Sequence, residues 1–164
     1  MVAPESVASS ATFLLGKLAG ISTSRFAERI AAFGLRPRHC GALEWLGAAP
    51  ATQLDLARAL GVTPSVVVDM LDELEALDAV RRNRDPRDRR RQIVELTPTG
   101  RALIGKAAHA AREVDTELLD NLDPRGRAGL LAALRQLAEE SGLPTGSPKT
   151  GSPKTSSKTG APST

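Results

Sequence analysis

The sequence predicts a mainly helical protein with one short β-hairpin, and three observations support that fold class. Apolar residues recur at helical spacing along most of the chain. One stretch of strand-like residues is interrupted by an arginine-rich turn. Aromatic residues make up only 2% of the 164, so the core has to be built from Leu, Val and Ala side chains on packed helices. About six helices are expected from the spacing.

Two helices come first. Over residues 7–33 the phase of the apolar positions shifts by one residue near Gly20, but the pattern still favours one long helix. Pro37 opens a second helix at its first turn, and this helix runs to Leu46 with Leu43 and Leu46 facing inward.

A short helix, a turn and a second amphipathic helix follow. Thr52, with Asp55 three positions later, starts the short helix, and Gly61 ends it. Thr63 as N-cap and Pro64 at the first helical position start the next helix, which ends near residue 77. Its buried stripe is expected to contain Val67, Met70 or Leu71, Leu74 and Leu77. This is a helix-turn-helix pattern, although other helical hairpins share it.

Two strand-like runs, at residues 80–84 and 92–96, flank the turn RDPRDRRR. They predict a β-hairpin with a basic tip, which together with the preceding helices makes a winged helix-turn-helix. Two capped helices complete the fold, one starting at Thr97 and Pro98 and the last at Asp123 and Pro124. The side chains expected to face inward from these two helices are Leu103, Ala107, Ala111, Val114 and Leu118, then Leu130 or Leu131, Leu134 and Leu137.

We expect four regions along the chain. The terminal helices show more apolar surface than one winged helix can cover, so we expect a symmetric homodimer. The tail has no apolar periodicity and repeats GSPKT, which predicts disorder. The regions are an N-terminal dimerisation helix at 1–34, a DNA-binding winged helix-turn-helix at 35–97, C-terminal dimerisation helices at 98–141, and a disordered tail rich in Lys, Ser and Pro at 142–164.

Charge is unevenly distributed. Residues 81–91 hold seven Arg and two Asp, a local charge of +5, and residues 64–78 hold five acids and no base, a local charge of −5, in a chain of formal net charge +3. A concentrated arginine segment favours a polyanionic partner. The alternative is a charge run that balances acids within its own fold.

Several function classes are disfavoured. The chain lacks a Gly-rich phosphate loop, HExxH, a nucleophile elbow and a carboxylate pair with a nearby base, so we expect no enzyme, no catalytic residue and no cofactor. Without a long apolar run or signal segment, and with one cysteine, a cytoplasmic protein is expected. Cys40 is expected to be an inert, half-buried thiol. His39, Cys40 and His109 could form a metal site, but their spacing is only a weak indication of one, so no metal is expected.

Residues 35–100 resemble the MarR family of bacterial winged-helix transcription regulators. The likeness rests on LRPRHCGAL, on QLDLARALGVTPSVVVDMLDELEALDAV and on RRNRDPRDRRRQIVELTPTG. Its most specific part is D-x-R followed by a strand and L-T-x-x-G. That pattern is met by Asp88, Arg90, Leu96, Thr97 and Gly100.

The resemblance implies a homodimer that binds a pseudo-palindromic operator in double-stranded DNA, most simply as a repressor released by a small ligand. It implies a recognition helix in the major groove and a wing arginine in the minor groove, which suits the dimensions and potential of the grooves. Arg90 would be that arginine and Asp88 its partner, unless Asp88 only shapes the turn. Arg82, Arg84 and Arg89 would contact the DNA backbone or brace the hairpin.

The expected recognition helix departs from the family pattern, which often has Thr and Arg where this chain has Val66, Val68 and Asp69. Helical spacing cannot bury Val66 and Val68 together with Val67, so we expect an exposed valine pair that contacts thymine methyl groups. Asp69 would accept from cytosine or face away from DNA. Alternatively this helix reads few bases and the wing supplies most of the affinity. The expected DNA-binding residues are Arg90, Arg89, Arg84, Arg82, Asp88, Ser65, Val66, Val68, Asp69, Thr63, Pro64, Gln53 and Arg38.

His39, Trp45 and His109 could border a cleft for a small aromatic or anionic effector, although packing is the simpler role for each. The main alternative function is a winged-helix protein-interaction module that has lost or weakened DNA binding. The acidic recognition helix supports that alternative.

Overall fold

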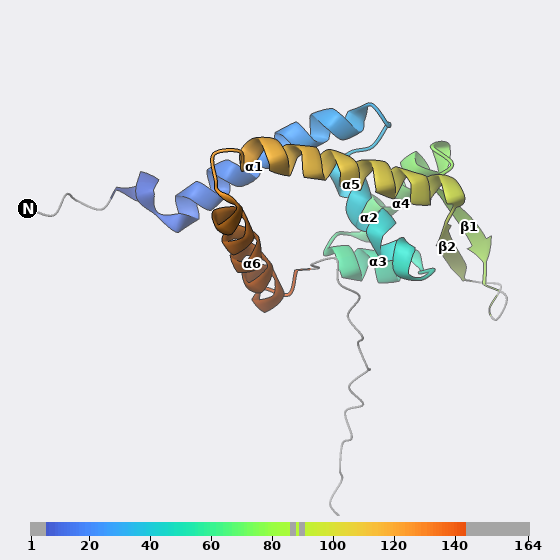
Figure 1. Cartoon of the computed structure of the whole chain (residues 1–164). Coiled ribbons are helices and arrows are strands. Elements are labelled where there is room, and N and C mark those ends of the chain that lie inside the picture. The colour runs from blue at the N-terminus through green and yellow to red at the C-terminus, as the bar shows by residue number, and fades with distance from the viewer. Residues whose placement is uncertain (1–5, 86–87, 89–90, 144–164) are drawn as a thin grey trace, which may run out of the picture.

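A computed structural model describes residues 6–85, 88 and 91–143. It confirms a mainly helical chain with a two-stranded wing (Figure 1). The order of elements is a 3-10 turn η1 (Val7–Ser9), α1 (Ala11–Ala31), α2 (Pro37–Ala48), α3 (Gln53–Leu60), α4 (Pro64–Ala76), β1 (Val80–Arg84), β2 (Gln92–Leu96), α5 (Pro98–Leu118) and α6 (Pro124–Glu140). Both strands have the predicted bounds. Apart from Gly142 and Leu143, the tail predicted at 142–164 lies outside the described residues.

Local capping explains where these helices begin and end. The Thr52 hydroxyl accepts from the backbone N–H of Asp55, and the Asp55 carboxylate accepts from the backbone N–H of Thr52 in return. Gly61 ends α3 in the left-handed conformation, at φ 65°. Thr63 starts α4 as predicted but makes no side-chain cap, because its hydroxyl lies 3.0 Å from that of Ser65 instead.

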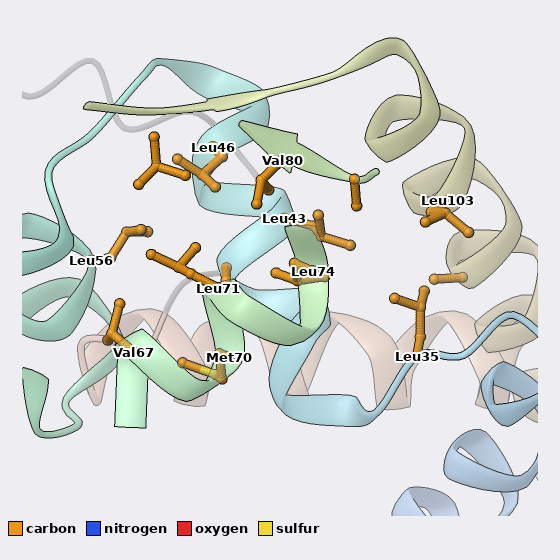
Figure 2. Close-up of a cluster of buried hydrophobic side chains, with 14 of the residues drawn as sticks. Leu35, Leu43, Leu46, Leu56, Val67, Met70, Leu71, Leu74, Val80 and Leu103 are labelled. Carbon is orange, nitrogen blue, oxygen red and sulfur yellow. The ribbon is translucent and has the colours of Figure 1, made fainter. Parts of the chain in front are cut away.

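The core lies where α2, α3, α4 and the hairpin meet the first half of α5 (Figure 2). On α4 both candidate positions of the stripe are buried, Met70 and Leu71, and Leu77 packs against the core at the end of the helix. On α5, Ala110 is buried, and Ala111, which was placed on the same face as Val114, is partly covered and lines a cavity together with Val114.

The prediction that the leucines of α6 face inward is also wrong for the single chain. Leu130, Leu131, Leu134 and Leu137 are 38–53% exposed, and α6 has no buried residue. The reason is that none of the described elements packs closely against α6, which extends from the end of α5 on the side of the molecule away from the hairpin (Figure 1).

The turn after α4 is joined to the start of α5. The Thr97 hydroxyl donates to the backbone carbonyl of Asp78 at 2.5 Å and accepts from the N–H of Gly100 at 3.0 Å. A Cβ at Gly100 would lie 2.1 Å from the carbonyl oxygen of Ala79. The T-x-x-G pattern therefore has a packing role, because Thr97 ties the two segments together and position 100 has no room for a side chain.

Among the described residues, none of the helices combines the length and the apolar character needed to span a bilayer.

Candidate nucleic-acid interface

The first turn of α4 presents a polar, exposed surface. Thr63, Pro64 and Ser65 are exposed, and one turn further so are Val68, at 38%, and Asp69. The first N–H groups of a helix lack intrahelical partners, so this end can donate to phosphate or base edges. Together these residues form a surface that can meet a polyanion.

The expected pair of exposed valines is only half correct. Val68 is exposed, whereas Val66 is partly buried and packs against the core. The apolar face of α4 is two rows wide, because Val66 and Met70 form one row beside the row of Val67 and Leu71. Val68 is therefore the exposed member of the predicted valine pair.

Arg82 does not face solvent as a DNA contact would. Its side chain is 16% exposed, and its guanidinium pairs with Asp72 at 2.6 Å and with Glu75. It also donates to the carbonyl of Val68 at 3.2 Å, while its backbone N–H donates to Glu75 at 3.1 Å. Arg82 was predicted either to contact the DNA backbone or to brace the hairpin. It braces the hairpin, because its guanidinium is paired with the carboxylates of Asp72 and Glu75 on α4.

The hairpin follows antiparallel register from Val80 opposite Leu96 to Arg84 opposite Gln92. Arg84 is exposed and lies at the outer end of β1. Arg89 and Arg90 lie outside the described residues, so the predicted pairing of Arg90 with Asp88 does too. Asp88 itself is exposed, and its carbonyl accepts from the backbone N–H of Arg91 at 2.9 Å.

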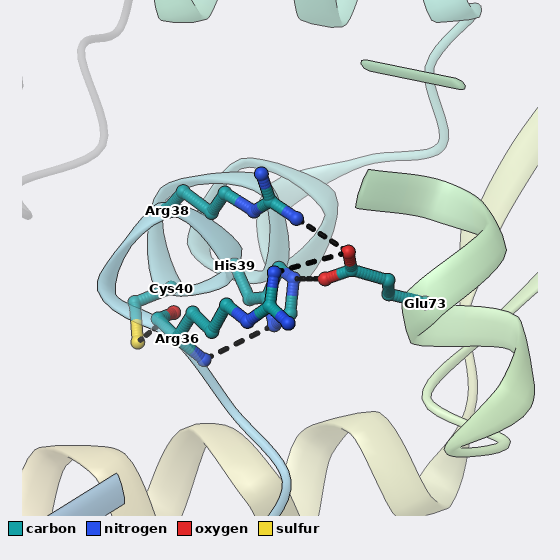
Figure 3. Close-up of polar contacts among 5 residues, drawn as sticks. All are labelled: Arg36, Arg38, His39, Cys40 and Glu73. Carbon is teal, nitrogen blue, oxygen red and sulfur yellow. Dashed lines mark hydrogen bonds and ion pairs between the residues drawn. The ribbon is translucent and has the colours of Figure 1, made fainter. Parts of the chain in front are cut away.

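The start of α2 holds a second ionic contact with α4, centred on Glu73 (Figure 3). The Glu73 carboxylate binds Arg38, Arg36 at 3.3 Å and His39 Nε2 at 2.7 Å. Arg38 is thus engaged within the protein, although its side chain stays 40% exposed. Gln53, the last of the predicted contacts, is partly buried at the start of α3.

The contacts of His39 define its proton positions. His39 is 1% exposed, and its Nδ1 accepts from the backbone N–H of Arg36 at 3.1 Å. Nε2 therefore carries the hydrogen and donates to Glu73. Burial lowers the pKa of His39 despite its bond to Glu73, and the neighbouring Arg38 holds the pKa of Glu73 below its usual value.

The acidic residues of α4 are therefore not mainly a solvated face, and the pairing of Arg82 with Asp72 and Glu75 matches the alternative of a charge run that balances acids within its own fold. Asp72, Glu73 and Glu75 each pair with arginine from a flanking element, and Asp69 is the acid exposed beside the first turn. The signal available in the sequence was the pair of adjacent runs of charge −5 and +5. It did not reveal which acid meets which base.

Residues 33–91 match a family model described as the MarR family. Over these residues the chain is similar to the MarR family. The transcriptional repressor NicR of Pseudomonas putida is 31% identical over 90 residues, which cover 55% of this chain and 57% of NicR. The chain thus spans less than two thirds of the length of that relative.

Solved structures extend the likeness to the whole fold. The repressor CouR bound to a 23-mer DNA duplex is 28% identical, with a TM-score of 0.70, and the match covers 84% of this chain and 99% of CouR. CouR from Rhodococcus jostii RHA1, bound to p-coumaroyl-CoA, is 24% identical with a TM-score of 0.70 over 86% and 97% of the two chains, and shows the fold alone. The two proteins named here, NicR and CouR, are both described as transcriptional repressors.

The described part of the chain has a cavity, but the three residues considered for an effector cleft, His39, Trp45 and His109, lie outside its lining. A cavity of about 240 Å³ opens between α1, the start of α2 and α5, and is lined by Ser22, Thr23, Phe26, Pro37, Ala111, Val114 and Asp115. His39 is enclosed by its own contacts, Trp45 is 47% exposed, and His109 is exposed beside Glu113 at 3.7 Å. None of the three lines this cavity, and the burial of His39 agrees with the simpler role of packing.

Cys40 is the partly buried thiol that was expected. Burial raises its pKa to about 11, so the reactive thiolate is scarce at neutral pH. Within the described part of the chain, no three His, Cys, Asp or Glu side chains are grouped as metal ligands would be.

Proposed function

We propose that this chain is a sequence-specific regulator of transcription that binds double-stranded DNA as a homodimer, most simply a ligand-responsive repressor. The observation that carries the proposal is the exposed first turn of α4, which Arg82 holds in fixed relation to the hairpin. DNA as the partner also implies the cytoplasm as the place of action.

The α4 end would enter the major groove, and the hairpin would reach the adjacent minor groove. A helix fits the wide major groove, and an arginine suits the negative potential of the narrow minor groove. In this arrangement Ser65, Val68 and Asp69 face base edges, and Arg90 and Arg84 face the minor groove or the backbone. The 28% identical CouR, solved on a duplex, supports this assignment.

The proposed dimer would be formed by residues 1–34 and 98–141, leaving 35–97 for DNA. The basis is apolar exposure at the end of the molecule opposite the hairpin (Figure 1). A symmetric dimer binds a pseudo-palindrome whose half-sites lie about 10 bp apart. The large apolar side chains exposed there on α1 and α6 are Phe13, Leu14, Leu15, Leu18, Ile21, Leu130, Leu131, Leu134 and Leu137.

The cavity between α1, α2 and α5 is the proposed effector site. Phe26, Pro37 and Val114 give it an apolar wall that suits an aromatic molecule. Asp115 makes an anionic group unfavourable at that end, so a neutral or cationic aromatic fits this cavity better than the anionic class.

Selection of genomic fragments by the purified full chain, followed by binding measurements over a salt series, tests the proposal. A regulator enriches a two-fold symmetric motif, and its affinity falls steeply with salt because phosphates are neutralised. The alternative, a protein-interaction module, is favoured only by the exposed Asp69. It predicts no enriched motif and no salt-dependent binding to duplex, and that outcome would overturn the proposal.

A further inference from the structure

We infer that Glu73 is a positioning residue, through which the first turn of α2 sets the orientation of the recognition helix α4. Occupation of the cavity would then alter DNA binding through this contact. The inference rests on the proposed function, because it concerns control of the same DNA-binding surface.

Pro37 connects the cavity to the contact. It lines the cavity and is also the first residue of α2. The residues on either side of it, Arg36 and Arg38, both bind the Glu73 carboxylate. A molecule that displaces Pro37 therefore displaces two of the groups that hold Glu73.

The contact is stiff enough to transmit such a displacement. His39 has almost no freedom to turn, because one ring nitrogen accepts from the Arg36 N–H at 3.1 Å and the other donates to Glu73 at 2.7 Å. Three side chains of one helical turn thus converge on a single carboxylate (Figure 3). The turn and Glu73 either move together or lose charge-assisted hydrogen bonds, which are stronger than neutral ones.

Glu73 is well placed to move the DNA-binding end of α4. It lies one helical turn after Asp69 on the continuous helix Pro64–Ala76. A helix carries a tilt along its length, so a shift at Glu73 is passed to the exposed residues of the first turn.

A second ionic contact on the same helix provides the control. Among the described residues, Glu75 binds Arg82 of the wing, whereas the first turn of α2 binds Glu73. Glu73 and Glu75 are alike in chemistry and in exposure, at 35% and 34% of the side chain. They differ in the element to which they connect α4.

A double-mutant cycle on the full chain tests the inference without a known ligand. Ala111→Leu places extra methyl groups in the cavity and serves as a built-in occupant. It is combined with Glu73→Gln and, as the matched control, with Glu75→Gln. The dissociation constant for a duplex obtained by fragment selection is measured at one salt concentration, and thermal unfolding confirms that each variant is folded.

Ala111→Leu is expected to weaken binding to the duplex about tenfold, both alone and in the Glu75→Gln background. In the Glu73→Gln background it is expected to weaken binding less than about twofold. The difference between these effects lies within the usual range of allosteric coupling. An equal effect in both backgrounds, or no effect in the otherwise natural chain, would refute the inference. If Glu73→Gln does not fold, Arg38→Gln replaces it in the cycle. In the Arg38→Gln background, Ala111→Leu is expected to weaken binding only about threefold. A weakening as large as in the otherwise natural chain would contradict the inference. If the natural chain binds no duplex, the proposed function itself fails.

Discussion

Substitution of Gly100 by alanine should strongly destabilise the protein, although alanine is the better helix former. A Cβ at position 100 would lie 2.1 Å from the carbonyl oxygen of Ala79 and 2.6 Å from a methyl carbon of Leu96. A Cβ atom essentially never lies within 3.0 Å of a non-bonded heavy atom, so the carbonyl oxygen and the Cβ must separate by about 0.9 Å, the difference between 3.0 and 2.1 Å. The Leu96 methyl can turn aside, whereas the carbonyl is backbone.

The magnitude follows from what that carbonyl holds. It accepts from the backbone N–H of Thr97 at 3.1 Å, and the Thr97 hydroxyl, which shares its one proton between this carbonyl and the nearer carbonyl of Asp78, also lies 3.1 Å away. Overpacking costs about 1–3 kcal/mol, and loss of a hydrogen bond adds about 1 kcal/mol. The helix propensity of alanine recovers up to about 1 kcal/mol. We expect Gly100→Ala to lower the free energy of unfolding by about 1–4 kcal/mol.

Gly105 is the matched control on the same helix. A Cβ there would meet nothing within 4 Å, so Gly105→Ala should stabilise the protein by up to about 1 kcal/mol. Urea unfolding of both variants, at one protein concentration because a dimer is proposed, measures the two changes. A Gly100→Ala protein as stable as the natural chain would refute the packing argument. Loss of stability in Gly105→Ala would refute the argument that alanine stabilises the helix through its higher helix propensity.

Three further outcomes are expected. Arg90→Ala should weaken operator binding by roughly 1–3 kcal/mol, most on sites with a narrow A·T-rich minor groove, and lower the salt slope by about one. Val68→Ala should weaken binding less and leave the salt slope unchanged. A larger loss of affinity in Val68→Ala than in Arg90→Ala, measured over a salt series, would contradict the assignment. Burial lowers the pKa of His39 from 6.5, so below that pH the unfolded chain binds a proton that the folded chain resists. The contribution of neutral His39 to stability should be complete above pH 6.5 and decline as the pH falls toward the lowered pKa, by at most ~1.4 kcal/mol per pH unit. Between about pH 5 and 8 the free energy of unfolding should therefore depend less on pH in His39→Gln than in the natural chain. An equal pH dependence in the two proteins would argue against this role of His39. Removal of residues 144–164 takes away three lysines and should weaken DNA binding only severalfold at low salt without changing the preferred site, whereas a lost preference would assign the tail a role in recognition.

The elements could be predicted from the sequence because their signals are local. Thr52 with Asp55, Gly61, and the paired strand-like runs each act within a few residues, and the observed bounds follow them. Contacts between distant segments left no such signal. The pairing of Ala51 with Val94, which ties the loop before α3 to the hairpin, could not be inferred from either segment alone.

Two errors concerned the extent of apolar surfaces. Periodicity shows that an apolar face exists but not how wide it is, which is why Val66 was predicted to be exposed. It also cannot show whether the covering surface lies in the same chain. The leucines of α6 have the spacing of a buried stripe, yet they remain exposed because the described part of the chain offers nothing to cover them.

The acidity of α4 was the strongest sequence argument against DNA binding, and the observed pairing weakens it. A polyanion is repelled by the net charge near the surface, not by the number of acids in a segment. Asp72 and Glu75 are opposed by Arg82, and Glu73 by two arginines and the proton of a histidine. The acidic residues thus hold the helix in place, and Asp69 is left as the carboxylate beside the DNA-facing turn. Asp69→Asn and Glu73→Gln each raise the net charge by one, but Asp69 lies beside the DNA-facing turn and Glu73 one helical turn further along α4. Asp69→Asn should therefore strengthen binding to non-specific duplex at low salt more than Glu73→Gln does, and equal gains from the two variants would show that the position of the charge on α4 has no effect.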